Sequence, residues 1–431
     1  MKRALMLAFA LLIACSAALA DTNELALKTA QRLIAGEYTA ICAQFDEGMR
    51  VVVDEGVLEA GVASITAQLG ACIEVADIQA DEASGTAAVV LAHERGNAVL
   101  SLAFDGEGKV ASMYIAPQQN AVSAVERPLP EGARAVAVTL FEGSDHALCG
   151  EWIIPANADE NTPYVVFAQG SGPSDMDETI SANKPFRDLA YDLAALGVGS
   201  LRHDKITYSH PQRPCETVDQ EYLYPAQEAL RVLKAQTGAQ HVYLIGHSLG
   251  GMLTPYLVES CGFDGGVSLA GTPLALWEIS MAQNLAVLAA MPQSQQPMLL
   301  AQIEAEKEKG LRLAQMSDEE AGQTTVFGMP GLYLAHMARL DQAKIAMDSG
   351  KPFLFLWGAA DFQVDRAAFD AWRERLGESP RFSYMTYPGL NHLFMPAGEN
   401  DSILNAQTAY AKPKQTDGRV VADIAAWIRQ N

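Results

Sequence analysis

The stretch His241-Val-Tyr-Leu-Ile-Gly-His-Ser-Leu-Gly-Gly251 is the strongest indicator of the fold of this chain. Val242 to Ile245 is a short apolar run, which is typical of a buried parallel strand. The Gly-x-Ser-x-Gly pattern centred on Ser248 follows, and apolar residues then recur at helical spacing. A strand, a sharp turn and a helix in this order would expose the Ser248 hydroxyl as a nucleophile. The amide of Leu249, at the start of the helix, would then point at a developing oxyanion.

Strand-like and helical segments alternate on both sides of this stretch. Apolar strands are expected at 164–168, 198–201, 242–245, 265–270, 352–357 and 382–387, with amphipathic helices between most of them. Such alternation indicates a mostly parallel sheet with helices on both faces. Two strands at 133–141 and 147–154 precede it as an antiparallel hairpin. We therefore expect an α/β domain over 133–431.

Two later loops offer partners for Ser248. Asp361 ends the run Trp-Gly-Ala-Ala-Asp after one buried strand, and His392 ends Tyr-Pro-Gly-Leu-Asn-His after the last strand. The carboxyl ends of parallel strands meet at one edge of a sheet, so the three side chains would converge there. Asp365 is the alternative acid, but its position before a predicted helix is typical of an N-cap. The sequence predicts a catalytic Ser-Asp-His triad.

A second oxyanion donor is expected in the loop Gln169-Gly-Ser-Gly-Pro-Ser-Asp175, which follows the strand at 164–168. Its glycines allow the backbone to approach a substrate closely. The Ser171 amide is the best candidate by position. His247, although next to the nucleophile, is expected to point elsewhere because side chains alternate along a strand.

These motifs resemble those of the α/β-hydrolases, of the exported bacterial carboxylesterase, dienelactone-hydrolase-like or serine-aminopeptidase-like kind. The resemblance rests on Gly-Ser-Gly-Pro-Ser-Asp, Arg202-His-Asp-Lys205, Gly-His-Ser-Leu-Gly-Gly, Gly-Ala-Ala-Asp-Phe-Gln-Val and Tyr-Pro-Gly-Leu-Asn-His-Leu-Phe. It implies the α/β-hydrolase fold and ester hydrolysis through an acyl-enzyme, with no cofactor or metal. Two features depart from it. Dienelactone hydrolases proper use a cysteine nucleophile, and Asp175-Met-Asp177 stands where Asp-Arg-Asp is more frequent.

An insertion at 272–350 separates two of the predicted strands and is helical by its periodicity. It is far longer than an ordinary connection, so we expect a lid over the active site. Seven of the fifteen methionines lie within it. They either shape an adaptable acyl pocket or pack the core of the lid itself.

The N-terminal segment has the features of a signal peptide over residues 1–20. Lys2 and Arg3 precede an apolar run too short to cross a bilayer, and Ala18-Leu-Ala20 offers a cleavage site. Export to the periplasm or the extracellular space is therefore expected. Leu12-Ile-Ala-Cys15 also resembles a lipoprotein box, so a lipid anchor at Cys15 is the alternative.

Residues 21–117 predict a separate small α+β domain, because amphipathic helices precede a meander of four strands. The arrangement resembles cystatin-like or nuclear-transport-factor-like domains. His93 is expected at its surface. Cys42 and Cys72 form either a disulfide or two free thiols. A polar linker at 118–132, with Pro128 and Pro130, would join the two domains.

The net charge of −22 argues against nucleic acid and anionic membranes as partners. No run of 18 or more apolar residues follows the signal peptide, so no membrane span is expected. The chain has neither a Cys-x-x-Cys nor a His/Cys cluster to indicate a metal site. The expected partner is a small-molecule ester, and the oligomeric state stays open.

Three functions compete on the sequence alone. A carboxylic ester hydrolase fits best. A peptidase or an acyl thioesterase would use the same triad, since the acyl-enzyme steps are shared. A non-catalytic binding protein would need a broken triad, whereas all three residues are present.

Overall fold

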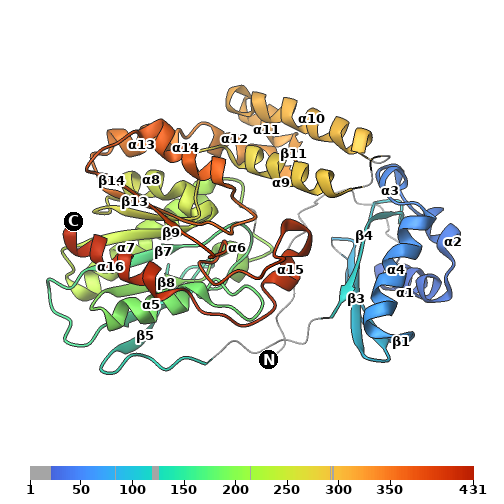
Figure 1. Ribbon diagram of the computed structural model, residues 1–431, viewed down its shortest axis with the longest axis horizontal. Coiled ribbons are helices and arrows are strands. Elements are labelled where there is room, and N and C mark those ends of the chain that lie inside the picture. The colour runs from blue at the N-terminus through green and yellow to red at the C-terminus, as the bar shows by residue number, and fades with distance from the viewer. Residues whose placement is uncertain (1–20, 83, 119–125, 214, 292, 294–295) are drawn as a thin grey trace. The chain divides into compact units, whose positions relative to one another are not determined.

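The structure, a computed structural model, describes residues 21–82, 84–118, 126–213, 215–291, 293 and 296–431 (Figure 1). The predicted signal peptide and the alternative anchor at Cys15 lie outside these residues. The described chain falls into two compact units, 21–118 and 126–431. Within the described ranges, no helix is both long enough and apolar enough to cross a membrane.

The first unit packs helices against one face of a four-stranded antiparallel sheet. The helices are α1 (Thr22–Ala35), α2 (Tyr38–Cys42), α3 (Glu47–Val52) and α4 (Glu55–Leu69), and the strands, in sheet order, are β1 (Cys72–Asp81), β2 (Thr86–His93), β3 (Gly96–Phe104) and β4 (Val110–Pro117). Ala26, Ile41, Phe45 and Leu100 are buried between the two layers. The helices and strands expected from the sequence are present, and the short α3 is additional. Asp46 caps α3 by accepting a hydrogen bond from Met49 N at 2.7 Å.

Two details of this unit concern its polar residues. The expectation that His93 lies at the surface is wrong. Its ring is buried, and Nδ1 lies 2.9 Å from the carbonyl oxygen of Gly70, because the end of α4 covers this end of β2. The five described cysteines are all free, so Cys42 and Cys72 are thiols rather than a disulfide.

The second unit contains an eight-stranded sheet in the order β14-β13-β10-β9-β7-β8-β6-β5. The strands are β5 (Arg134–Leu140), β6 (Leu148–Ile154), β7 (Tyr164–Ala168), β8 (Gly199–His203), β9 (Val242–His247), β10 (Gly266–Leu269), β13 (Phe353–Gly358) and β14 (Phe382–Tyr387). The six strands from β14 to β8 are parallel, and β6 and β5 add an antiparallel edge. The predicted parallel sheet and entry hairpin are confirmed.

Helices cover both faces of this sheet (Figure 1). On one face lie α5 (Pro185–Ala195) and α16 (Gly418–Gln430), which bury Phe186, Leu189, Ile424 and Trp427 against the strands. On the other face lie α7 (Tyr224–Thr237), α8 (Leu249–Cys261) and α14 (Arg366–Leu376), with Leu253, Leu257, Phe369 and Trp372 in the core. Shorter segments are α6 (Ile206–Ser209), the π-helix η1 (Asp219–Leu223), the 3₁₀ turn η3 (Ile403–Asn405) and α15 (Ala406–Ala409). These two apolar layers fix the positions of the strands and of the loops that follow them.

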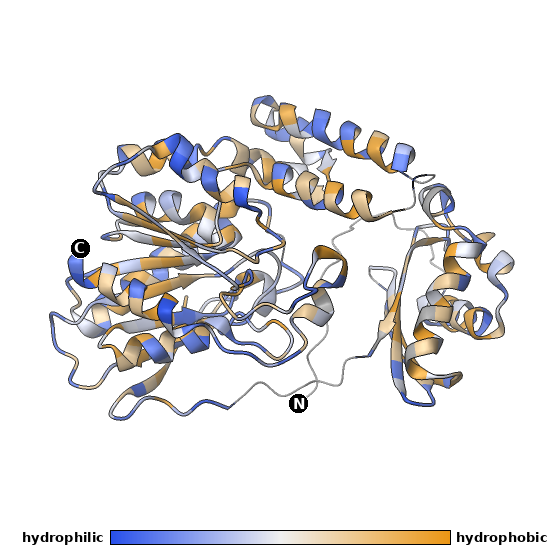
Figure 2. Cartoon of the chain, viewed as in Figure 1, coloured by the Kyte–Doolittle hydropathy of each residue, from blue (hydrophilic) through white to orange (hydrophobic). Residues whose placement is uncertain are grey.

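The insertion between β10 and β13 is helical, as expected. It comprises α9 (Leu276–Ala290), α10 (Gln296–Arg312), η2 (Leu313–Gln315), α11 (Asp318–Gly322), β11 (Thr325–Val326), β12 (Met329–Pro330), α12 (Gly331–Ala338) and α13 (Gln342–Asp348). Hydrophilic and hydrophobic residues alternate along α10 in Figure 2, the pattern of a helix with one buried side. Met281, Met316 and Met329 pack against an apolar cluster around Trp277 and Leu334. These methionines therefore fill the insertion's own core.

Candidate active site

Ser248 lies at a strained turn between β9 and α8. Its backbone angles are φ 52° and ψ −113°, in a region that residues with a side chain rarely adopt. Gly246 and Gly250, which flank the serine, do not have a positive φ. They are therefore not needed to allow a left-handed backbone. A Cβ on Gly246 would lie 2.1 Å from the Gly250 carbonyl oxygen, and one on Gly250 would lie 2.2 Å from that of Ala168. The glycines thus allow the strand and helix to approach, while Ser248 itself carries the strain.

Asp361 is fixed in the loop that follows β13. Its side chain is fully buried, and Oδ1 accepts hydrogen bonds from the amides of Gln363 at 2.7 Å and Val364 at 3.0 Å. The other oxygen, Oδ2, lies 2.6 Å from His392 Nδ1. Asp365 instead caps α14 through the amide of Ala368 at 2.8 Å, so its predicted capping role is confirmed.

His392 is presented by a tight loop after β14. The side chain of Asn391 holds this loop by accepting hydrogen bonds from the amides of Leu393 at 3.0 Å and Met395 at 3.1 Å. Because Asp361 can only accept while it is ionised, His392 donates its Nδ1 proton to it. The imidazole Nε2 is then left with a free lone pair. This is the tautomer that a general base needs.

The three predicted residues follow β9, β13 and β14 and therefore lie at the same edge of the parallel sheet. Asp361 and His392 are in direct contact. Ser248 adjoins His247, whose ring centroid lies 4.7 Å from that of His392. The arrangement gathers a strained serine, a histidine of fixed tautomer and a buried carboxylate at one place. Such a set of side chains can perform nucleophilic acyl transfer.

The two predicted oxyanion donors flank Ser248. Leu249 is the first residue of α8, and within the described residues its amide has no hydrogen-bond acceptor. Ser171 follows Gly170, whose Cα is so close to the serine that a Cβ there would lie 3.2 Å from Ser248 Cβ. The Ser171 amide is likewise unpaired in the part of the chain that the structure describes. Both amides are thus available to an oxygen at this position.

The loop that carries Ser171 is held in place by Lys205, a residue to which the sequence analysis gave no role. This lysine is 1% exposed. Its Nζ lies 2.7 Å from the Gly170 carbonyl oxygen, 3.1 Å from that of Gly172, and 3.0 Å from Glu221 Oε1. The Tyr222 hydroxyl lies 2.6 Å from the same Nζ. The only available signal was the place of Lys205 in the Arg-His-Asp-Lys motif.

Two tyrosines complete this buried cluster. Tyr222 donates a hydrogen bond to the Gly170 carbonyl oxygen at 2.9 Å, and Tyr333 of α12 donates to Glu221 Oε2 at 2.5 Å. Burial, reinforced by the charge of Glu221, raises the pKa of both hydroxyls well above the usual value. They consequently remain donors. Through Tyr333, the insertion is linked to the cluster beneath the Ser171 loop.

The departure at Asp175-Met-Asp177 also has a structural account. Asp177 forms ion pairs with the buried Arg202 and, at 2.7 Å, with Lys184. The amide of Met176 donates to Asp204 Oδ1 at 2.8 Å. Burial, the main influence, raises the pKa of Asp204 to about 6. The loop is therefore anchored by these contacts without an arginine at position 176.

The chain matches the alpha/beta hydrolase family over residues 165–402. It is 33% identical over 344 residues to esterase EstD of Thermotoga maritima, across 78% of each chain. Among solved structures, an esterase of Pyrococcus furiosus is 14% identical, covers 72% of this chain and 97% of its own, and has a TM-score of 0.43. Est1E of Butyrivibrio proteoclasticus is 15% identical over 68% of this chain and 99% of its own, with a TM-score of 0.43. Sequence identities of 14% and 15% give no information about the substrate of this chain. The family match and the EstD relationship identify the chain as a member of the alpha/beta hydrolase family.

Proposed function

We propose that this protein is a serine esterase that hydrolyses small-molecule carboxylic esters through Ser248, His392 and Asp361. The observation that carries the proposal is the 2.6 Å hydrogen bond between His392 Nδ1 and Asp361 Oδ2, at the sheet edge where Ser248 occupies its strained turn. The similarity to an esterase over 78% of the chain supports ester hydrolysis.

In the first half of the reaction, His392 Nε2 takes the proton of Ser248 as its oxygen attacks the ester carbonyl. The carboxylate of Asp361 stabilises the imidazolium that forms. The tetrahedral intermediate collapses, the bond to the alcohol breaks, and the imidazolium returns its proton to the leaving oxygen. An acyl group remains on Ser248. In the second half, His392 takes a proton from water as the water oxygen attacks the acyl carbonyl. The bond from the acyl carbon to the Ser248 oxygen then breaks, His392 returns the proton to that oxygen, and the carboxylic acid is released.

The oxyanion would be bound by the amides of Leu249 and Ser171. The contacts of Gly170 support the choice of Ser171. The Gly170 N–H is already occupied, since it donates to Glu178 Oε1 at 2.6 Å. The Gly170 carbonyl is held by Lys205 and Tyr222. Because the C=O and N–H of one trans peptide point in opposite directions, the Ser171 amide faces away from Lys205. A donor fixed in advance in this way is what transition-state stabilisation requires.

Steady-state kinetics on p-nitrophenyl esters of short and medium chain length test this function. We expect Ser248→Ala to lose activity by a factor on the order of 10⁴–10⁶. Ser260→Ala, an exposed serine on the same helix, is the matched control and should retain wild-type rates. Turnover of p-nitroanilides in preference to esters would instead favour the peptidase alternative, and turnover of acyl thioesters the thioesterase alternative. Full activity of Ser248→Ala would remove the serine from the mechanism.

Export is a second part of this proposal, and it rests on Lys2 and Arg3, the short apolar run that follows them and the Ala18-Leu-Ala20 sequence. N-terminal analysis of the protein recovered outside the cytoplasm should find Asp21 as the first residue. A lipidated Cys15 in the membrane fraction would favour the anchored form, and an intact Met1 in the cytoplasm would contradict export.

A further inference from the structure

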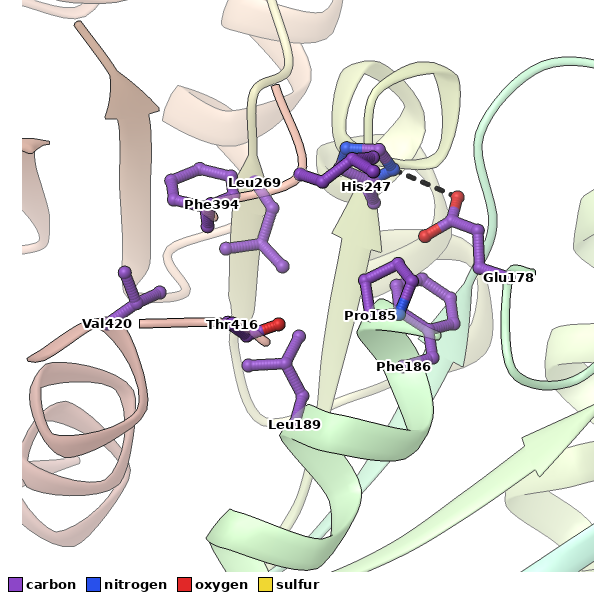
Figure 3. Close-up of a pocket in the computed structure, with 10 residues that line it drawn as sticks. Glu178, Pro185, Phe186, Leu189, His247, Leu269, Phe394, Thr416 and Val420 are labelled. Atoms are coloured by element: carbon purple, nitrogen blue, oxygen red, sulfur yellow. Dashed lines mark hydrogen bonds and ion pairs between the residues drawn. The ribbon is translucent and has the colours of Figure 1, made fainter. Parts of the chain in front are cut away.

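His247 is a buried titratable residue that the mechanism above does not use. It is 3% exposed, ends β9 and immediately precedes Ser248. Its Nδ1 lies 2.9 Å from Glu178 Oε1, the contact drawn in Figure 3. Its Nε2 lies 3.0 Å from the backbone carbonyl oxygen of His392. One ring therefore joins the strand of the proposed nucleophile to the loop of the proposed base.

The partners of His247 determine its charge. A backbone carbonyl oxygen accepts hydrogen bonds and cannot donate them, and the same is true of a carboxylate. Glu178 Oε1 also accepts from the Gly170 amide, which fits an ionised oxygen. Both ring nitrogens of His247 must then carry protons. Burial alone would disfavour this state, but the charge and hydrogen bond of Glu178 outweigh it, and the pKa of His247 is raised. Asp361, on the far side of His392, acts in the same direction.

The surroundings of Glu178 leave little room for water beside the pair. A small cavity next to it is lined by the polar Thr416 and by apolar side chains from α5, β10 and the loop after His392: Pro185, Phe186, Leu189, Leu269 and Phe394 (Figure 3). The cavity has room for roughly one water molecule. Little solvent therefore competes with His247 for the carboxylate, so the pair is strong and its loss costly.

We propose that Glu178 and His247 are positioning residues of the esterase, a buried ion pair that holds the oxyanion loop and the His392 loop in their reactive arrangement. The inference rests on the function proposed above. Through Glu178 the pair fixes the Gly170 amide, one residue before the proposed donor Ser171. Through His247 it fixes the backbone of His392. Neither side chain exchanges a proton with substrate. The pair sets where the oxyanion donor and the base lie relative to Ser248.

Two substitutions separate the two contacts. Glu178→Gln keeps the shape but removes the negative charge. His247→Gln places an amide near the position of Nε2, so it can keep the contact with His392 but loses the one with Glu178. His210→Gln is the matched control, because His210 also bonds a backbone carbonyl, that of Ala147 at 2.9 Å, away from the site. The full-length protein is used throughout.

The readout is kcat per active site on p-nitrophenyl esters, with sites counted by the stoichiometry of phosphonate labelling. Displacement of catalytic groups by about 1 Å costs on the order of 100-fold, so we expect kcat to fall by about 10- to 100-fold in each variant, with KM changed by less than about threefold. The kcat of the double variant should lie no more than about threefold below that of the less active single variant, because the two residues act as one unit. The control should match the wild type.

Other outcomes have distinct meanings. Wild-type kcat per labelled site in both variants, with only a lower melting temperature, would overturn the positioning role and leave a purely stabilising pair. Absence of labelling in the wild-type enzyme would instead contradict the serine esterase itself.

A measurement on the wild-type enzyme covers the case in which the variants do not fold. Nitrogen-15 NMR of histidine-labelled protein, recorded as the pH is raised, should show one imidazole that keeps both nitrogens protonated after the exposed histidines have become neutral. A spectrum in which every imidazole loses its proton together with the exposed ones would contradict the ion pair.

Discussion

On one side of Ser248, the Asp361 and His392 loops are held mainly by backbone amides, whereas on the other side the 169–184 loop is held by buried charges. The first side uses the amides of Gln363 and Val364 and the local side chain of Asn391. The second uses pairs that are distant in sequence, Lys205 with Glu221 and Glu178 with His247.

Precise positioning of the backbone costs more on the second side of Ser248 than on the first. A carboxylate held by adjacent amides needs only a tight turn. A loop of backbone carbonyls and amides next to the nucleophile has no such regular partners, so charged side chains from other elements must orient it. Buried charges are destabilising unless each is matched. We therefore expect substitutions on the first side to reduce mainly the activity. Substitutions on the second side should reduce both the activity and the stability of the fold.

The two aspartates on the first side should differ most strongly in their effect on kcat. Asp361→Asn should lower kcat on the order of 10⁴-fold, because an amide no longer holds the required imidazole tautomer. Asp365→Asn should leave kcat unchanged and stability within about 0.5 kcal/mol, since asparagine is an equally good N-cap. Ester hydrolysis and thermal unfolding measure both. The reverse pattern would make Asp365 the acid.

Lys205→Met tests the second side. The substitution leaves Glu221 and the carbonyls of Gly170 and Gly172 without their cation, so we expect a loss of about 3–5 kcal/mol in unfolding free energy together with reduced kcat. The five tryptophans all lie in the second unit, so their fluorescence in urea reports this unit alone.

The exposed Lys344, paired with Asp348, is the control for Lys205. Lys344→Met should leave the free energy of unfolding almost unchanged, because exposed ion pairs contribute little. Equal effects at the two lysines would remove the contrast between the two sides of Ser248.

Tyr333→Phe probes the link from the insertion to the oxyanion loop. Loss of a hydrogen bond to the buried Glu221 should cost about 1–3 kcal/mol and lower kcat less than Lys205→Met does. Tyr224→Phe, at a half-exposed tyrosine, should change neither quantity. If Tyr333→Phe altered chain-length preference with no change in stability, its hydroxyl would belong to substrate binding rather than to the cluster.

Asp204 should give the stability of the wild type a pH dependence. Its folded-state pKa, raised to about 6 by burial, lies above the unfolded value, so its contribution to stability is present at low pH. That contribution should be lost as pH rises from about 4 through about 6. The stability of the wild type relative to Asp204→Asn should fall over this range in urea titrations. A difference in stability between the two proteins that does not change with pH would indicate that the Asp204 carboxyl is solvated in the folded state.

The sequence was sufficient for the first side because its determinants are local. Asp361 and His392 each stand within a few residues of an apolar strand, and chain order supplied the rest. The second side was not predictable, because Lys205 contacts Gly170 across 35 residues and Tyr333 contacts Glu221 across 112. His93 was misjudged for the same reason, since the residue that satisfies its ring, Gly70, lies 23 positions away. His247 was set aside on strand alternation, which describes direction but not partners.

Mass spectrometry after reaction with a serine-directed phosphonate identifies the nucleophile. We expect one adduct per chain, located on the peptide that contains Ser248, formed in parallel with the loss of ester hydrolysis and greatly slowed in His392→Gln. An adduct on another serine that abolishes activity, or full hydrolysis by an enzyme labelled at Ser248, would contradict this expectation.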